Sequence, residues 1–379
     1  MIIDTLSIIG ITVAVVIAVL SLWCSPFRRK LRVATAGSPA APQPLSLILM
    51  THGNTQALAD CLPLWLNQEY AADLQIIVVV DEGDHQAEDI IKRLSGSHRL
   101  YSTFVPQSSR YMSRRKLAVT LGVKAARHDW VLLADADCRP ASLQCLTAIM
   151  THCQPETVNQ TMVPVYYDEA SRGFYQFERL HRALYYIGRA LRGRAYSTNA
   201  HCLVFRKHQF MDGQGFLGSL HLLWGEYATL VNKYAAPHAT AIALDEEARL
   251  TQRKPTTAEW RKDQVRALDT NRHLGHGGLY HAVYRLDQTA LYLAYLLQIA
   301  TSVYGALTQR WVMMGVAIAM LLLTVVVRVL WIRRTIHTLN IPMKLWATPF
   351  YELRITGHNA LTWLRHRLTD KTEFTSHKL

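Results

Sequence analysis

Three long runs without a charged residue constrain this chain more than any other feature of its sequence. They cover residues 6–24, 289–307 and 311–327. A helix that crosses the hydrocarbon core of a membrane needs about 20 consecutive apolar residues. Inside lipid, only helices and closed barrels satisfy their own backbone hydrogen bonds. We therefore predict one membrane-spanning helix near the start of the chain and a hairpin of two such helices near its end.

The charges beside these runs predict their orientation. Asp4 is the only charged residue before the first run, whereas basic residues 28–30 follow it, and Arg328 follows the third run. Basic residues accumulate on the cytoplasmic side of membrane proteins, while a cleaved signal peptide would carry positive charge before its apolar segment. This pattern predicts a multi-pass protein in the inner or plasma membrane of a bacterium, with the residues between the first two runs in the cytoplasm.

The net charge of +13 raises the question of an anionic partner. The basic residues cluster beside the apolar runs and along the tail, so anionic lipid head groups explain them better than nucleic acid does, at about 1 kcal/mol per well-placed Lys or Arg. A solvated surface without a specific partner is the alternative. The six cysteines form no Cys-x-x-Cys pair, which favours buried or free thiols over disulfides or a zinc site.

The segment between the first two runs has the pattern of an α/β domain. Residues 33–44 are small and rich in proline, which predicts a linker. Beyond it, strands are expected at 45–50, 75–80, 100–105 and 130–135, and helices at 55–68, 85–94 and 113–127. Strands that alternate with helices of this length predict βαβ units and a mostly parallel sheet.

The strand at 130–135 carries the strongest chemical signal. It runs directly into Asp135 and Asp137, one residue apart. Ligands of such sheets bind at the carboxyl ends of the strands, and residues i and i+2 of an extended chain point to the same side. Two carboxylates there suit Mg²⁺ or Mn²⁺, which could hold a nucleoside diphosphate. A pair of solvated acids in a turn is the structural alternative.

Three further polar segments precede this strand in a definite order. A strand leads into Thr51 and Asn54, the next strand ends at Asp81, and a helix begins at Ser113 with the basic residues 114–116, which include Arg115 and Lys116. Together with the Asp-Ala-Asp segment, they resemble the family 2 inverting glycosyltransferases of the GT-A fold, particularly membrane-anchored bacterial members. The resemblance covers roughly residues 44–272.

The resemblance implies roles for these residues. Asp81 would accept a hydrogen bond from the nucleotide base, and Lys116 with Arg115 would meet the diphosphate. Asp137 would bind the metal, and Asp135 would bind either the ribose or the metal. Thr51 and Asn54 would lie near the nucleotide. Capping of turns and solvated helix charges are the structural alternatives for these polar side chains.

The resemblance also implies a general base, which deprotonates the acceptor hydroxyl. The family places this acid in an acidic pair after a glycine-rich stretch. Glu226 is the only carboxylate at that place, and Tyr227 stands where the second acid would be. Asp212 and Asp245 are nearby candidates if the alignment is shifted. Arg266 retains part of the family's Gln-x-x-Arg-Trp signature and could touch a phosphate.

The residues and the resemblance together predict a non-processive, metal-dependent transferase that moves one sugar from a nucleotide sugar to an acceptor. The expected acceptor is a lipid-linked glycan of the cell envelope. His201 could line the acceptor pocket. A catalytically silent membrane subunit that binds a nucleotide sugar or a partner enzyme is the alternative. The predicted segments are an anchor with a basic flank (1–32), the linker (33–44), a cytoplasmic GT-A domain (45–275), a transmembrane hairpin (286–334) and an amphipathic, basic cytoplasmic tail (335–379).

Overall fold

The computed structural model describes residues 4–31, 42–51, 53–107, 113–168, 173–370 and 374. Most of the predicted linker, and the last residues of the predicted tail, lie outside these ranges. The chain divides into two compact units. One comprises residues 1–32, 172–185 and 278–360, and the other comprises residues 33–171, 186–277 and 361–379.

The second unit contains a seven-stranded sheet with the order β3-β2-β1-β4-β8-β6-β9. Its parallel part comprises β1 (Leu45–Met50), β2 (Leu74–Asp81), β3 (Leu100–Val105) and β4 (Trp130–Asp135). The remaining strands are β8 (Cys202–Arg206), which runs antiparallel to β4, β6 (Gln160–Met162) and β9 (Thr240–Ile242). The mostly parallel α/β sheet predicted from the sequence is confirmed.

A second, smaller sheet lies in the same unit, with the order β5-β10-β7. It comprises β5 (Arg139–Pro140), β10 (Leu250–Gln252) and β7 (Val165–Tyr167). The helices of this unit are α2 (Thr55–Leu66), α3 (His85–Leu94), α4 (Arg114–Ala125), α5 (Cys145–Thr151), α7 (Lys207–Asp212), α8 (Glu226–Tyr234) and α9 (Thr257–His273). Two further helices, α6 (Phe174–Arg192) and α12 (Thr348–Leu368), each contribute residues to both units.

Local sequence explains why the parallel elements form. All six residues of β1 and of β4 are buried, as expected for strands covered on both faces. Asn54, Asp84 and Ser113 accept backbone N–H groups at the starts of α2, α3 and α4, which is the usual role of these residue types. Gly122 allows α4 to pack closely on the sheet, because a Cβ there would lie 2.6 Å from Ile48 Cγ2.

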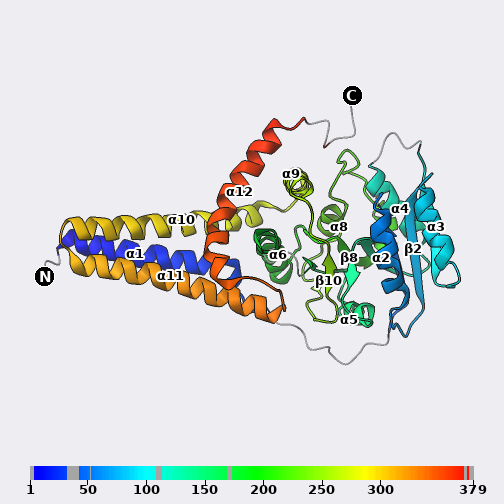
Figure 1. The fold of residues 1–379 in the computed structure, drawn as a ribbon, viewed down its shortest axis with the longest axis horizontal. Helices are drawn as coiled ribbons and strands as arrows, with labels where there is room; N and C mark the ends of the chain where they lie inside the picture. Colours follow the sequence, from blue (N-terminus) through cyan, green and yellow to red (C-terminus); the bar gives the residue numbers. More distant parts are fainter. Residues whose placement is uncertain are drawn as a thin grey trace. The chain divides into compact units, whose positions relative to one another are not determined.

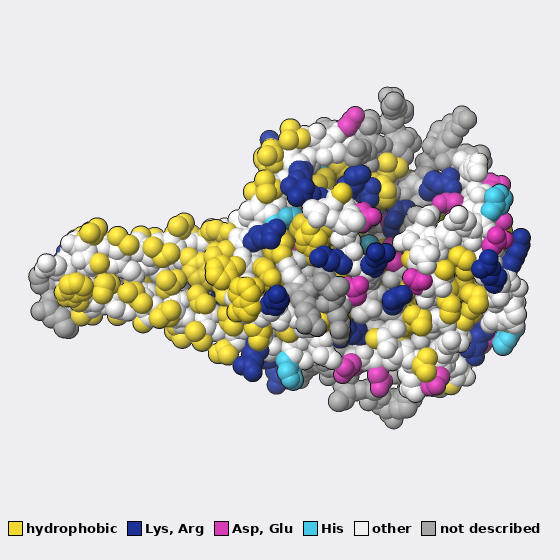
Figure 2. All heavy atoms as spheres, in the orientation of Figure 1, with side chains coloured by type: hydrophobic (Ala, Val, Ile, Leu, Met, Phe, Trp, Pro, Cys, Tyr) yellow, Lys and Arg dark blue, Asp and Glu magenta, His cyan; other side chains and the backbone are white. Residues whose placement is uncertain are grey.

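The first unit contains three long apolar helices, α1 (Thr5–Cys24), α10 (Gly278–Leu307) and α11 (Trp311–Thr338). They lie side by side as a three-helix bundle (Figure 1). Each is long and apolar enough to cross a membrane, and apolar side chains cover the visible face of the bundle (Figure 2). The three runs predicted from the sequence therefore form helices of the required length. Arg328 does not end the last helix, which continues to Thr338.

The unit also contains short 3-10 turns at Pro26–Arg28 and Leu345–Ala347. The second turn leads directly into α12. Aromatic side chains of α6 and α12 pack together here: the ring centroids of Phe177 and Tyr351 lie 5.7 Å apart. These contacts bring α6, α12 and the bundle into one core.

Candidate functional site

The register of the sheet brings the predicted polar residues to one edge. Met50 pairs with both Val79 and Asp135 across the neighbouring strands. The residues that follow β1, β2 and β4 therefore emerge at the same carboxyl edge. Thr51 is buried there, and its hydroxyl donates to the Val79 carbonyl at 3.3 Å. Asn54 lies one turn further on and uses its side-chain oxygen to cap α2 through the Ala57 N–H at 3.2 Å.

Arg115, in the first turn of α4, joins two carboxylates at this edge. Its Nε donates to Glu226 Oε1 at 2.7 Å, and its Nη2 donates to Asp135 Oδ2 at 3.2 Å. We call these three residues the Arg115 cluster. Burial alone would lower the pKa of Arg115, but the carboxylates of Glu226 and Asp135 raise it above its usual range. The guanidinium therefore stays positively charged.

Two aromatic side chains complete the surroundings of Asp135. The Tyr227 hydroxyl donates to Asp135 Oδ1 at 2.8 Å, and His201 Nδ1 lies 3.0 Å from Asp135 Oδ2. The rings of His201 and Tyr227 are stacked, with centroids 5.7 Å apart. Burial, followed by the nearby Asp135 charge, raises the pKa of Tyr227 well above its ordinary value. Its hydroxyl therefore remains a hydrogen-bond donor to Asp135.

Asp137 lies on the turn that follows β4 and is half-buried. Its Oδ1 accepts a hydrogen bond from the Gln252 side-chain amide at 2.8 Å. Gln252 is the last residue of β10, so a residue of the small sheet holds the Asp137 carboxylate in place. The two carboxylates of the Asp-Ala-Asp segment therefore have different partners: a cation and a phenol for Asp135, and a neutral amide for Asp137.

A cleft of about 370 Å³ opens beside the Arg115 cluster. It is lined by Thr51, Val79, Val80, Asp81, Val105, Arg114, Arg115, Ala118, Trp224 and Arg266. The Arg266 guanidinium lies 3.5 Å from the centroid of the Trp224 ring, a stacked cation–π arrangement. Arg114 forms an ion pair of 2.5 Å with Asp81, which also lines the cleft. Three arginines and one aromatic ring make this cleft suited to a planar, anionic ligand.

The backbone at the start of α8 places Glu226 in this site. Gly225 precedes the helix with φ of +80°, and a Cβ at this position would lie 2.3 Å from Thr270 Cγ2. Only glycine combines this conformation with this close approach to α9. Glu226 is buried in the first turn of α8, where the partial positive charge of the helix start favours a carboxylate.

Lys116 does not line the cleft. Its side chain is fully buried, and its ammonium group donates to the Ser219 carbonyl and lies 5.6 Å from the centroid of the Phe216 ring. Burial lowers the pKa of Lys116 to about 8, although the Glu226 carboxylate partly opposes this effect. The structure thus assigns Lys116 to the packing of the glycine-rich segment, while the neighbouring Arg114 and Arg115 face the cleft.

The donor atoms present fit a metal held jointly with a ligand. Within the described ranges, no group of three or more His, Cys, Asp or Glu side chains could hold a metal ion. A magnesium or manganese ion bound with a nucleotide needs only one or two protein carboxylates, because phosphate oxygens and water complete its shell. Asp137 and Asp135 can supply these carboxylates, since an ionised carboxylate keeps lone pairs beside the hydrogen bonds that it accepts.

Of the residues predicted from the sequence, the structure brings together Thr51, Asp81, Arg115, Asp135, Glu226 and Arg266, with Asp137 and His201 beside Asp135. Asp245 instead pairs with His152, and Asp212 lies exposed at the end of α7. Sequence reasoning missed the cleft residues Arg114 and Trp224. The sequence offered one signal for each residue: Arg114 is a basic residue beside Arg115, and Trp224 is a tryptophan two residues before Glu226.

Comparisons with known proteins agree with this architecture. The fold is similar to that of the mannosyltransferase PcManGT from Pyrobaculum calidifontis, solved in complex with GDP-Man and Mn²⁺, with 16% identity and a TM-score of 0.53 over 84% of this chain and 98% of that one. S. aureus TarS 1–349 in complex with UDP-GlcNAc also aligns, with 14% identity and a TM-score of 0.41 over 65% of this chain and 71% of that one. No curated protein matches the sequence significantly.

The sequence also matches a family model over nearly its whole length. The matched residues are 6–373, and the model describes glycosyl transferase family 21. The prediction of a glycosyltransferase is confirmed, whereas the likeness to family 2 stays a resemblance. The chain belongs to glycosyl transferase family 21.

Proposed function

We propose that this glycosyltransferase moves one sugar from a nucleoside diphosphate sugar to an acceptor hydroxyl, with inversion at the anomeric carbon. The observation that carries the proposal is the Arg115 cluster, which sets Asp135 and Glu226 side by side at the carboxyl edge of the sheet and beside a cleft with three arginines. This is where open α/β sheets bind their ligands. The GDP-Man and Mn²⁺ of the solved mannosyltransferase are consistent with such a ligand.

The donor would bind in the cleft. Arg115 and Arg266 would contact the diphosphate, since guanidinium groups bind phosphate oxygens through paired hydrogen bonds. Asp81 would accept a hydrogen bond from the base, and its ion pair with Arg114 fixes its position. Thr51 would shape the floor of the cleft near the nucleotide. Asn54 would remain a helix cap.

Asp137, with Asp135 as a second ligand, would hold Mg²⁺ or Mn²⁺ together with the diphosphate. When bound, the metal supplies Lewis-acid stabilisation of the negative charge on the leaving diphosphate. Asp135 would contribute an oxygen lone pair that its hydrogen bonds from Arg115 and Tyr227 do not use. Gln252 keeps Asp137 in one orientation through its amide.

Glu226 would act as the general base. The acceptor oxygen forms a bond to the anomeric carbon while the bond from that carbon to the diphosphate oxygen breaks. The hydroxyl proton goes to the Glu226 carboxylate. Because Arg115 donates to Glu226 at 2.7 Å, this hydrogen bond has to weaken before Glu226 can take a proton. Contacts of Arg115 with the donor diphosphate would have that effect.

The three apolar helices support a membrane-anchored enzyme. In this proposal they cross the inner or plasma membrane, the domain at 45–275 lies in the cytoplasm, and the acceptor is a lipid-linked glycan of the cell envelope. The hairpin at 286–334 and the tail at 335–379 would hold that domain against the bilayer. Single-sugar transfer fits the three candidate spans found in the part of the chain that the structure describes.

A catalytically silent, nucleotide-sugar-binding subunit is a second candidate. One observation favours it: Tyr227 follows Glu226 where a second acid would stand, and its hydroxyl is bonded to Asp135 rather than to an acceptor site. In such a protein the cleft would bind a nucleotide sugar without transferring the sugar.

The test is release of nucleoside diphosphate from a panel of nucleotide sugars by the detergent-solubilised full chain with Mn²⁺. Wild type, Asp137→Ala and the exposed control Asp89→Asn are compared. Release by wild type and the control, but not by Asp137→Ala, supports the transferase. Metal-dependent nucleotide binding without release, also with lipid-linked acceptors present, supports the silent subunit. Absence of metal-dependent nucleotide binding contradicts both. Glu226→Gln is then assayed with an acceptor, because slow hydrolysis does not test this base.

A further inference from the structure

Helix α12 has its polar face inside and its apolar face outside. Thr348, Glu352, His358 and Thr362 are buried at 0%, 2%, 7% and 5% exposure. On the opposite face Phe350, Leu361, Leu364 and Leu368 are exposed at 67%, 52%, 47% and 77%. Helices at a protein–water boundary show the reverse arrangement, with the apolar stripe against the core. The exposed stripe is therefore expected to contact an apolar environment rather than water.

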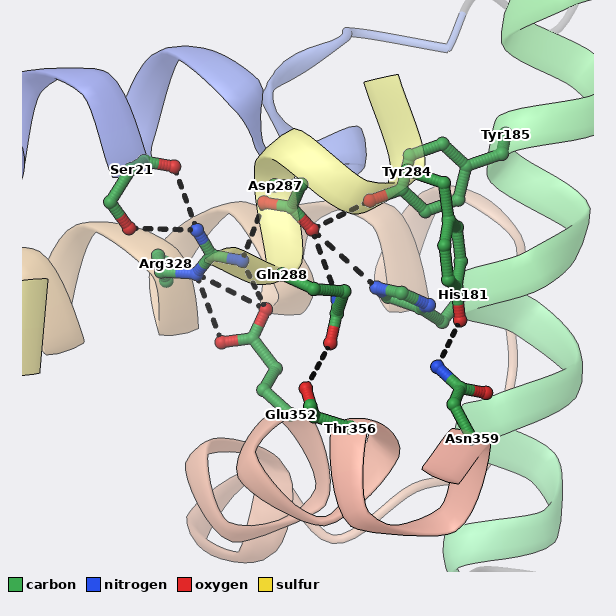
Figure 3. A network of polar contacts seen from close by, with 10 residues as sticks. All are labelled: Ser21, His181, Tyr185, Tyr284, Asp287, Gln288, Arg328, Glu352, Thr356 and Asn359. Atoms are coloured by element: carbon green, nitrogen blue, oxygen red, sulfur yellow. Dashed lines mark hydrogen bonds and ion pairs between the residues drawn. The ribbon is translucent and has the colours of Figure 1, made fainter. Parts of the chain in front are cut away.

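Three polar side chains of α12 form hydrogen bonds or ion pairs with the bundle (Figure 3). Arg328 Nε donates to both oxygens of Glu352 at 3.2 and 3.0 Å. The Thr356 hydroxyl donates to Gln288 Oε1 at 2.6 Å, and the Asn359 amide donates to the Tyr284 hydroxyl at 2.7 Å. These three contacts, four and three residues apart, fix the rotation of α12 about its own axis. The apolar stripe cannot turn inward without breaking them.

Arg328 ties this helix to the other elements of the bundle. Its Nη1 donates to the Ser21 carbonyl on α1 at 2.8 Å, and its Nη2 donates to Asp287 on α10 at 3.3 Å and to Glu352 at 3.0 Å. We call Arg328, Asp287 and Glu352 the Arg328 cluster. All three side chains are at most 2% exposed. Buried charge pairing therefore helps to set the position of α12, together with the packing of Tyr351 on α6.

The direction of α12 suits a membrane surface. Its first half runs across the axis of the three-helix bundle (Figure 1). If α1, α10 and α11 cross a bilayer, this first half of α12 lies close to the membrane plane. Trp346, 74% exposed, lies in the turn that leads into α12, and tryptophan is the residue type that favours the lipid–water boundary. The exposed cations Lys344, Arg354 and Arg367 accompany the stripe.

We propose that α12 lies in the lipid–water interface of an anionic membrane, with its apolar stripe among the acyl chains. Lys344, Arg354 and Arg367 bind the phosphates of the head groups there. The proposal rests on the membrane anchoring contained in the proposed function. The bilayer is favoured over a second copy of the chain as the occupant because α12 begins in the same unit as the apolar bundle, and because the stripe carries cations along its length.

The test places a nitroxide spin label at position 350 or 361 of the full chain in lipid nanodiscs. Phe350→Cys and Leu361→Cys are made in a Cys24→Ser background, because the other five cysteines are buried. Power saturation then compares collisions with oxygen, which concentrates in lipid, and with a water-soluble nickel chelate. Labels at Ile318→Cys on α11 and Asp89→Cys on α3 serve as the lipid and water references.

The proposal predicts an oxygen-to-nickel accessibility ratio at 350 and 361 severalfold above that at position 89. It also predicts a higher ratio in discs with phosphatidylglycerol than in pure phosphatidylcholine. Replacing Lys344, Arg354 and Arg367 by glutamine should abolish that lipid dependence, and added glycerol phosphate should leave it unchanged.

Four outcomes overturn the inference. A water-like ratio at 350 and 361, with a lipid-like ratio at 318, shows that the spans are embedded and α12 is not. Low accessibility to both reagents indicates a protein partner such as a second copy. A water-like ratio at 318 as well contradicts the membrane anchoring itself, so the two failures are distinguishable. A lipid dependence that glycerol phosphate removes points to a free-phosphate site.

Discussion

The Arg115 and Arg328 clusters have the same chemical composition but differ in their exposure to solvent. Each contains one guanidinium bonded to one aspartate and one glutamate. The Arg115 side chain is 23% exposed and lines a cleft. The Arg328 side chain is 1% exposed, and all three of its nitrogens donate to oxygens of the chain itself. The same charges can therefore serve two purposes.

The difference shows how exposure decides the role of an ion pair. A buried pair is not in itself more stabilising than apolar packing, but removing one partner leaves an uncompensated buried charge. That situation applies to Arg328 in full. Arg115 lies at a wall that a ligand can reach, so a phosphate or a metal can replace one of its present partners. We therefore expect Arg328 to govern stability and Arg115 to govern activity.

The largest expected effect is that of Arg328→Gln. It leaves Asp287 and Glu352 buried without their cation, which should lower the free energy of unfolding by about 3–5 kcal/mol. Denaturant unfolding of the detergent-solubilised chain measures this loss. Arg333→Gln, at an exposed position one turn further along α11, should change stability by less than about 0.5 kcal/mol. Equal stability of the two variants would show that the Arg328 cluster does not hold the helices together.

Arg115→Gln should instead reduce activity. Loss of a positioned donor near the reacting charge costs about 10²–10³-fold in turnover. Nucleoside diphosphate release and unfolding are measured on the same preparation. Unchanged turnover combined with a stability loss as large as that of Arg328→Gln would remove the distinction between the clusters.

Lys116 predicts a pH dependence that sharpens the same comparison. Its pKa is lowered to about 8 by burial, so between about pH 8 and pH 10.5 the unfolded chain binds more protons than the folded one, and stability rises with pH. Below pH 8 the lysine is protonated in both states and adds no pH dependence. Relative to Lys116→Met, wild type should gain about 2 kcal/mol by about pH 9.5.

Unfolding curves of both proteins between pH 7 and 9.5 provide the measurement. Lys124→Met, at an exposed position on the same helix, should parallel wild type over this range. If Lys116→Met parallels it too, the lysine is not buried as the structure shows.

The smallest expected effect is that of Tyr227→Phe. It removes the hydrogen bond to Asp135 Oδ1 but keeps the ring stacked on His201, which should cost about 1.5 kcal/mol of stability. Thermal unfolding detects this change, and His201→Phe provides a comparison that keeps the stacking but removes the imidazole. A loss above that of Arg328→Gln would mean that the phenol, rather than the guanidinium, holds the site together.

Much of the fold could be predicted because its signals are local. The buried strands are apolar throughout, the helix starts carry Asn54, Asp84 and Ser113 as caps, and the apolar runs have the length of a span. The end of the third span could not be located in this way. Arg328 interrupts the apolar run, but its charge is satisfied by residues distant in sequence, so α11 continues through it.

The candidate site was predictable to the level of segments, but not of individual side chains. The basic start of α4 was recognised, yet Arg115 faces the cleft whereas Lys116 is buried. One residue turns a helix by about 100°, so neighbouring cations reach different surroundings. The position of Trp224 near Glu226 did not reveal its partner Arg266, which is far from it in sequence. Gln252 gave no signal of its own, because its role depends on the distant Asp137.

The sequence by itself determined the α/β alternation, the three apolar helices and the position of the Asp-Ala-Asp segment after a buried strand. Each of these depends on residues that are close together in the chain. The order of these segments was also enough to indicate a glycosyltransferase. The tertiary structure decided which charges are paired and which face of α12 is buried. A helical sequence with one polar and one apolar face does not specify which face meets the protein. Here that choice depends on Arg328 and Asp287. Both are far from Glu352 in sequence and come close to it only when the helices pack together.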